Sequence, residues 1–213
     1  MLKVKQFQFN MFGVNTYIVW NPNTLEAVVV DPGMIGPHEQ RLFDRYIEEN
    51  SLNLTMLINT HLHIDHLFGD SYVKTKYHLS LKANVSDAFL GERVLQQARM
   101  FGLPEMVDAV VIDNNLSEEM LIEVCGEKMQ VYEVPGHSPG SIALYFPMSG
   151  ILFTGDALFK QSIGRTDLVG GDYSQLINSI TNKLLTLPSN TIVYPGHGPI
   201  TTIGDEQLEN PFL

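Results

Sequence analysis

The segment with the clearest chemical potential is a His-x-His-x-Asp-His motif at residues 61–66. His61 and His63 are two residues apart, so on an extended segment their imidazoles point to the same side. Asp65 and His66 follow at the start of a predicted helix and can reach a second, adjacent point. Imidazoles packed this closely repel one another when protonated and need many partners when neutral. The motif therefore indicates a metal site rather than a solvated polar loop.

A metal centre needs more ligands than this motif supplies, and three other residues at strand ends are candidates. His137 and His197 each follow a Pro-Gly dipeptide at the end of an apolar strand, and Asp156 follows Gly155 at the exit of another. Functional groups in α/β sheets are displayed where buried strands meet such turns. The candidate set holds five of the seven histidines and two carboxylates. These donors suit Zn²⁺, Fe²⁺ or Mn²⁺ rather than thiophilic metals.

The elements that must position these residues are strands with interspersed helices. Short β-branched and apolar runs bounded by turn residues predict strands, and amphipathic spacing predicts helices. The predicted strands cover residues 4–9, 14–20, 27–31, 54–58, 79–83, 119–123, 128–134, 142–146, 151–154 and 191–194. The predicted helices cover residues 37–50, 67–76, 86–101 and 172–187, and Ser86 or Asp87 is expected to begin the third. This pattern predicts the α/β or α+β class.

Composition narrows the function classes. The 213 residues include 13 Lys and Arg against 24 Asp and Glu, a net charge of −11, which argues against nucleic-acid binding. The single cysteine excludes an internal disulfide framework and a Cys-rich zinc module. No apolar run approaches the roughly 20 residues of a membrane span, and the N-terminus lacks a signal-peptide pattern. We expect one domain over residues 1–213, a cytoplasmic location and no membrane partner, and the oligomeric state stays open.

The seven candidate residues, in this order and spacing, resemble the metallo-β-lactamase-fold hydrolases and, within them, the glyoxalase II-like branch. The segments 155–159, 164–167 and 194–199 also resemble that branch, and the resemblance extends from Asn15 to the C-terminus. Only 16 residues follow His197. The resemblance therefore implies a member that lacks the C-terminal helical region of glyoxalase II.

The resemblance implies a four-layer αβ/βα sandwich, with two mixed β-sheets flanked by helices. It also implies two divalent ions, for which we expect zinc, with iron or manganese as alternatives. The first ion would be held by His61, His63 and His137. The second would be held by Asp65, His66 and His197. Asp156 would bridge them.

The reaction that this arrangement implies is hydrolysis by a hydroxide held between two metals, with Asp65 and Asp156 as catalytic ligands. A thioester such as S-lactoylglutathione suits the site, because a thiolate leaving group with a pKa near 8.5 needs little acid assistance. The partner is thus expected to be a small-molecule thioester. Arg165 is a candidate substrate contact, or else forms a structural ion pair with Asp167 that braces the metal loop. The 86–101 helix is interpreted as core or subunit contact, with a substrate wall as the alternative.

Three other functions compete with thioester hydrolysis. A persulfide dioxygenase would use one Fe²⁺ on His61, His137 and Asp156. A nuclease or phosphodiesterase of the same fold is disfavoured by the net charge of −11. A non-catalytic metal-binding module is disfavoured because the ligand set is complete. Cys125 falls at no ligand position, which argues against β-lactamases that place a thiolate on the second metal.

Overall fold

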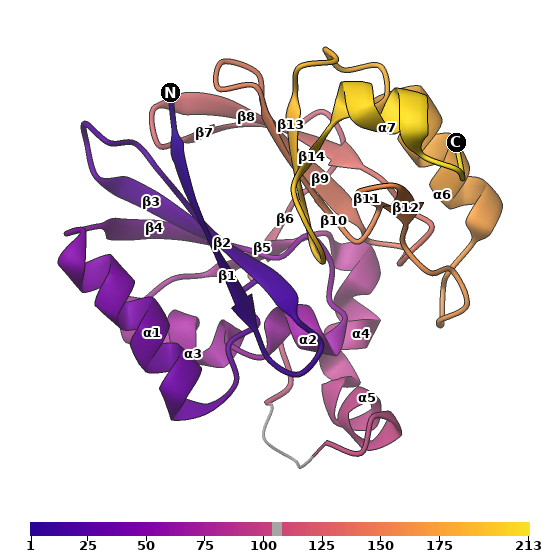
Figure 1. The fold of residues 1–213 in the computed structure, drawn as a ribbon. Helices are drawn as coiled ribbons and strands as arrows, with labels where there is room; N and C mark the ends of the chain where they lie inside the picture. The colour runs from indigo at the N-terminus through magenta and orange to yellow at the C-terminus, as the bar shows by residue number, and fades with distance from the viewer. Residues whose placement is uncertain (104–107) are drawn as a thin grey trace.

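Two mixed β-sheets form the centre of the computed structural model, which describes residues 1–103 and 108–213 (Figure 1). The first sheet has the order β1-β2-β3-β4-β5-β6. β1, β2 and β3 are antiparallel, and β3 to β6 are parallel. Its strands are β1 (Lys3–Phe9), β2 (Val14–Trp20), β3 (Glu26–Val30), β4 (Asn53–Ile58), β5 (Leu81–Ala83) and β6 (Asn114–Asn115).

The second sheet has the order β14-β13-β10-β9-β8-β7, and its one parallel pair is β10 with β13. Its strands are β7 (Leu121–Val124), β8 (Glu127–Glu133), β9 (Ile142–Phe146), β10 (Ile151–Gly155), β13 (Ile192–Pro195) and β14 (Thr201–Thr202). A separate small hairpin is formed by β11 (Leu158–Phe159) and β12 (Ser162–Ile163).

Helices cover the outer face of each sheet (Figure 1). The first sheet carries α1 (Gly36–Glu49), α2 (Ile64–Leu67), α3 (Asp70–Tyr77), the 3₁₀ turn η1 (Val85–Asp87), α4 (Ala88–Glu92) and α5 (Val94–Met100). The second carries α6 (Tyr173–Ser179), its continuation as the π turn η2 (Ile180–Leu184), and α7 (Ile203–Glu209). Within the described residues, no helix has the length and apolar character needed to cross a membrane.

Alternate residues of the central strands pack into different layers of the core. In β2, Ile18 and Trp20 join the cluster beneath the first set of helices, whereas Tyr17 and Val19 join the cluster between the sheets. In β10, Leu152 instead faces the cluster under α6 and α7. Because both faces of each sheet are buried, these strands are mostly apolar on both faces and do not alternate with exposed polar residues. The predicted four-layer sandwich is confirmed.

The helix predicted over residues 86–101 is interrupted, and Asp87 stands at the N-cap position of α4 as expected. Arg93 is both the C-cap of α4 and the N-cap of α5, so two short helices replace one. The Asn84 side chain accepts from the Ser86 amide at the start of η1, and Asp87 makes no side-chain cap. The Asp87 carboxylate is used elsewhere, beside the candidate metal centre. Strands β6, β11, β12 and β14 are two residues long, too short for a periodic signal, and were not predicted.

Candidate metal centre

The ligand motif of the first half lies directly after β4. The chain leaves the strand at Ile58, bends at Thr60, is extended at His63, and then begins α2, which carries Asp65 and His66. His61 and His66 are 1% and 0% exposed, so they belong to the interior and not to a solvated loop. The motif thus runs from a buried strand into a helix, as its sequence indicates.

The other three candidates follow strands of the second sheet, and glycines bring them close. Asp156 follows β10, and its Oδ1 would lie only 2.1 Å from a Cβ at Gly196. A Cβ at Gly136 would lie 2.3 Å from the Leu176 amide nitrogen, and the φ of Gly136 is +132°. Glycine is therefore needed at Gly196 for close packing against Asp156, and at Gly136 for close packing against α6 and for its backbone conformation.

The first sheet also holds the turn that carries His197. The Asn15 side chain donates to the carbonyl oxygens of Pro195 and Gly198, both at 2.9 Å. The Tyr17 hydroxyl donates to the same Pro195 oxygen at 2.7 Å. Hydrogen bonds from β2 thus join the two halves of the sandwich at the site.

The seven predicted residues lie together in three overlapping groups. In each group the potential ligand atoms are within 4.8 Å of one another. The groups are His61, His63 and His137; His61, His66 and Asp156; and Asp65, His66 and His197. Asp156 lies between the two halves, because its Oδ2 is 3.5 Å from Nε2 of His137 and 3.5 Å from Nε2 of His197.

Buried atoms without hydrogen-bond partners show that this donor set fits a cation. Among the described residues, His61 Nε2, His66 Nε2 and Asp156 Oδ1 are buried and have none. Nδ1 of His63 also lies only 2.8 Å from Nε2 of His137. An unpaired buried polar atom is costly, and several that converge are explained by a shared ion. Imidazole and carboxylate donors fit Zn²⁺, Fe²⁺ or Mn²⁺.

The second ring nitrogens of three histidines are held by neighbouring groups. Nδ1 of His66 is 3.0 Å from Asp31 Oδ2, and Nδ1 of His137 is 2.7 Å from the Arg165 carbonyl oxygen. Nδ1 of His61 is 3.1 Å from the Thr60 hydroxyl, which donates to Asp31. These contacts fix the tautomers that leave each Nε2 free as a ligand.

Asp31 and Asp87 contact the ligand segments, although neither was predicted as a site residue. Asp31 ends a predicted strand and was assigned no role at the metal centre. The buried Asp87 carboxylate accepts from the Leu62 amide at 3.1 Å, the Ser138 hydroxyl at 2.7 Å and the Gly140 amide at 2.6 Å. It therefore connects the loop of His61 and His63 to the loop that follows His137.

The histidines of the cluster differ in the direction of their pKa shifts. Burial, followed by repulsion from neighbouring imidazoles, lowers the pKa of His63 to about 3 and that of His61 well below its ordinary value. Burial also lowers the pKa of His66, but Asp156, Asp65 and Asp31 outweigh it and hold that pKa well above the ordinary range. These three carboxylates thus favour a positive charge at the position of His66. Metal and proton compete for this position.

A pocket of about 510 Å³ opens above the cluster, with ligands at its floor. Its walls come from the β1–β2 turn, from α4 and α5, and from residues 159–169. Arg165 lines it and is paired with Asp167, but the two side chains are 57% and 68% exposed. The Arg165 backbone carbonyl contacts His137 directly, and the exposed ion pair is expected to add little to the stability of this loop. The 86–101 segment supplies part of the wall through Leu90, Gln97 and Phe101.

The fold and the donor set define a metal-binding enzyme of the two-sheet sandwich class. The chain belongs to the Metallo-beta-lactamase superfamily, whose family model matches residues 10–197. The resemblance found in the sequence is thereby confirmed.

Three similar proteins cover nearly the whole chain. The hydroxyacylglutathione hydrolase GloC of Haemophilus influenzae is 39% identical over 204 residues, 95% of this chain and 93% of that protein. The crystal structure of the B3 metallo-beta-lactamase BLEG-1 is 35% identical, with a TM-score of 0.91 and 99% of each chain covered. The structure of TTHA1623 in a di-iron-bound form is 34% identical, with a TM-score of 0.85, and covers 98% of this chain and 100% of that one.

Proposed function

We propose that the chain is a binuclear metallohydrolase that cleaves thioesters such as S-lactoylglutathione. The observation that carries this proposal is the pair of ligand groups on either side of Asp156, at the floor of an open pocket. The similarity to hydroxyacylglutathione hydrolase GloC supports the choice of a thioester.

Each half of the cluster would hold one divalent ion. His61, His63 and His137 form the first ligand group, and Asp65, His66 and His197 the second, with Asp156 shared. Zinc is the first choice of metal, and the di-iron form of TTHA1623 makes iron the principal alternative. When bound, two such ions supply Lewis acidity for the substrate carbonyl and lower the pKa of water, so that a nucleophile is available near neutral pH.

Two carboxylates position the two halves of the centre. Asp156 Oδ2 lies 3.5 Å from Nε2 of His137 and of His197, so the carboxylate is placed to serve both halves of the centre. Asp65 Oδ2 lies 3.1 Å from Nε2 of His197, and together they hold the second group at the pocket floor. No side-chain acid is required, because a thiolate leaving group has a pKa near 8.5.

The proposed partner is a small molecule, in a cytoplasmic setting. The net charge of −11 argues against polyanionic partners, so we propose neither a nucleic acid nor a membrane as ligand. The likeness to BLEG-1 makes β-lactam hydrolysis the second activity to measure.

A substrate panel on protein of known metal content tests the proposal. S-lactoylglutathione, a lactone, a β-lactam and glutathione persulfide are supplied in turn, and O₂ uptake is recorded with the last. Thioester cleavage by protein with two zinc ions per chain is the expected result. One iron per chain with O₂ consumption on the persulfide would instead identify a dioxygenase, and β-lactam cleavage alone a lactamase.

A further inference from the structure

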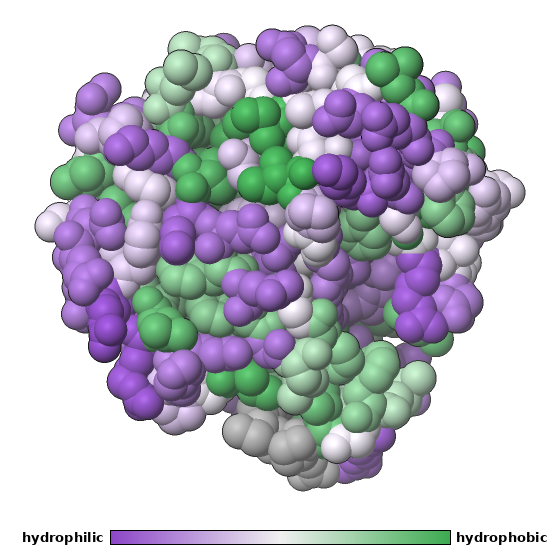
Figure 2. Space-filling view, in the orientation of Figure 1, coloured by the Kyte–Doolittle hydropathy of each residue, from purple (hydrophilic) through white to green (hydrophobic). Residues whose placement is uncertain are grey.

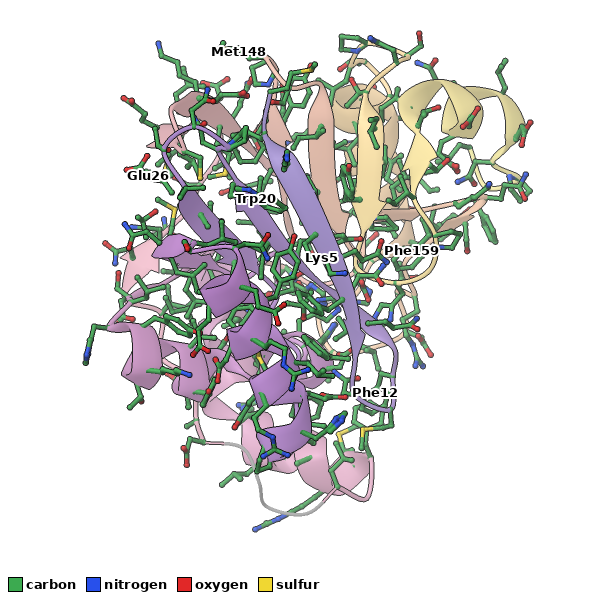
Figure 3. All side chains as sticks on the ribbon, turned by 60° about the vertical axis from the view of Figure 1, so that its left-hand side comes forward. Lys5, Phe12, Trp20, Glu26, Met148 and Phe159 are labelled. Carbon is green, nitrogen blue, oxygen red and sulfur yellow. The ribbon has the colours of Figure 1, made fainter. Side chains whose placement is uncertain are left out.

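One wall of the pocket is built from aromatic and sulfur-containing side chains. Phe12 lies at the tip of the β1–β2 hairpin (Figure 3), and its ring meets that of Phe101 edge-on at a centroid distance of 5.3 Å. Leu90 and Met100 continue this wall. Met100 is 68% exposed although it is large and apolar. Hydrophobic residues accordingly gather over α5 in Figure 2.

The opposite wall is also apolar and begins at the metal ligands. The Phe159 ring stands edge-on to the His197 ring at a centroid distance of 6.2 Å. Ile163, Leu168 and Val169 extend this wall towards solvent, and Val169 is 66% exposed. Apolar surface that faces solvent on both sides of a pocket is typical of a site that binds an apolar group.

The polar side chains of the pocket, apart from the metal ligands, are largely occupied. Gln97 Oε1 accepts from the Ile64 amide at 3.1 Å, and its Nε2 donates to the Leu90 carbonyl at 2.8 Å. Arg165 makes two hydrogen bonds to Asp167, both at 2.7 Å. Away from the metal ligands and Arg165, a charged group between these walls would lose hydration and meet few polar side chains. An apolar group would gain by leaving water.

We infer that this pocket selects thioesters by an uncharged, apolar acyl group, such as a medium-length aliphatic chain held between the Phe12–Phe101 wall and the Phe159 wall. The inference rests on the proposed thioester hydrolysis and names the substrate class for that site. The charged ends of a carrier such as glutathione, with its two carboxylates and one ammonium, stay outside the pocket. The carrier therefore contributes little to selectivity.

The test combines acyl groups and carriers on the zinc-loaded enzyme. Acetyl and hexanoyl thioesters are made with glutathione and with the uncharged N-acetylcysteamine, and S-lactoylglutathione is included. We expect kcat/KM to rise at least about tenfold from acetyl to hexanoyl on both carriers, because each buried methylene adds to binding. We expect a change of carrier to alter kcat/KM less than about threefold, because the carrier then contributes less binding free energy than one typical hydrogen bond.

A variant connects this preference to the wall. Phe101→Ala should reduce the ratio of hexanoyl to acetyl kcat/KM several-fold, whereas Leu208→Ala, a change of an 88% exposed residue on α7, should leave the ratio unaltered. Both kcat/KM values are measured on one preparation, so any unfolded fraction of the enzyme cancels in their ratio.

Two kinds of failure are distinguishable. The inference is overturned by any of four results: a hexanoyl preference below about tenfold, a best rate on S-lactoylglutathione, a carrier effect above about threefold, or an unchanged ratio in Phe101→Ala. Each of these results leaves thioester hydrolysis in place. If protein with two zinc ions per chain cleaves no thioester, the proposed function falls as well.

Discussion

Asp87→Asn is the most informative single change outside the ligands themselves. The aspartate uses both oxygens: Oδ2 accepts from the Leu62 amide and the Ser138 hydroxyl, and Oδ1 accepts from the Gly140 amide. Asparagine has nearly the same shape but only one acceptor oxygen, and its amide nitrogen donates. With the oxygen kept towards Leu62 and Ser138, an NH₂ group faces the N–H of Gly140.

The cost follows from these contacts. A hydrogen bond to a charged acceptor is lost, and a buried N–H is left without a partner, which together amount to about 3 kcal/mol of unfolding free energy. Water cannot easily replace the lost contact, because a Cβ at Gly140 would lie 2.7 Å from the Asp87 Cγ. For a chain of this length the loss corresponds to a Tm lower by about 6–12 °C. Loosening both ligand loops should also weaken zinc binding about 10–100-fold.

Two measurements on one preparation check this prediction. Thermal unfolding is recorded after chelation, so that metal binding does not contribute to Tm, and zinc affinity is obtained by competition with a chromophoric chelator. Asp205→Asn, on the exposed surface of α7, is the control with the same change of charge and should alter neither quantity. A Tm within about 3 °C of the parent, together with unchanged zinc affinity, would show that Asp87 does not connect the loops.

Three further changes probe other parts of the molecule. Asp156→Ala should reduce thioester turnover about 10³-fold or more with an unchanged far-UV circular dichroism spectrum; full activity would contradict its shared role. Arg165→Ala should shift Tm by less than about 3 °C, because its exposed ion pair with Asp167 contributes little and His137 contacts the Arg165 backbone carbonyl. A drop of about 6 °C would show instead that the ion pair stabilises the metal loop. Burial raises the pKa of Asp44, but hydrogen bonds from Lys76, Tyr72 and Tyr77 outweigh it, so that pKa is lowered on folding. The stabilisation is therefore present above the unfolded pKa of about 3.9 and is lost as the pH falls through the lower folded value. Asp44→Asn should cost about 1–2 kcal/mol in urea unfolding at pH 7 and less at pH 3; equal losses at both would contradict this linkage.

The ligand residues could be predicted from sequence because their positions are encoded locally. The motif at residues 61–66 follows one apolar strand, and each Pro-Gly-His turn follows another. Gly136 and Gly196 are the residues that permit close packing at these turns, and they are visible in the sequence. Strand ends and turn glycines are short-range signals, so they can be recognised without knowledge of the tertiary structure.

The groups that support the ligands could not be predicted in the same way. Asp87 lies 51 residues from Ser138, and Asp31 lies 35 residues from His66, so neither pairing has a local signature. Asp87 stands where a helix cap is expected, and tertiary hydrogen bonds outweigh that local preference. The support that Arg165 gives to His137 comes from a backbone carbonyl, which every residue type possesses.

The central claim is that two metal ions held by these seven residues carry out thioester hydrolysis. The most direct measurement is a zinc titration of the metal-free protein, with S-lactoylglutathione and hexanoyl thioester cleavage and bound zinc followed in the same samples. We predict that activity rises until two equivalents of zinc are bound per chain, and that Asp156→Ala neither binds the second equivalent nor gains activity. A protein that binds both equivalents and cleaves neither thioester would contradict the claim.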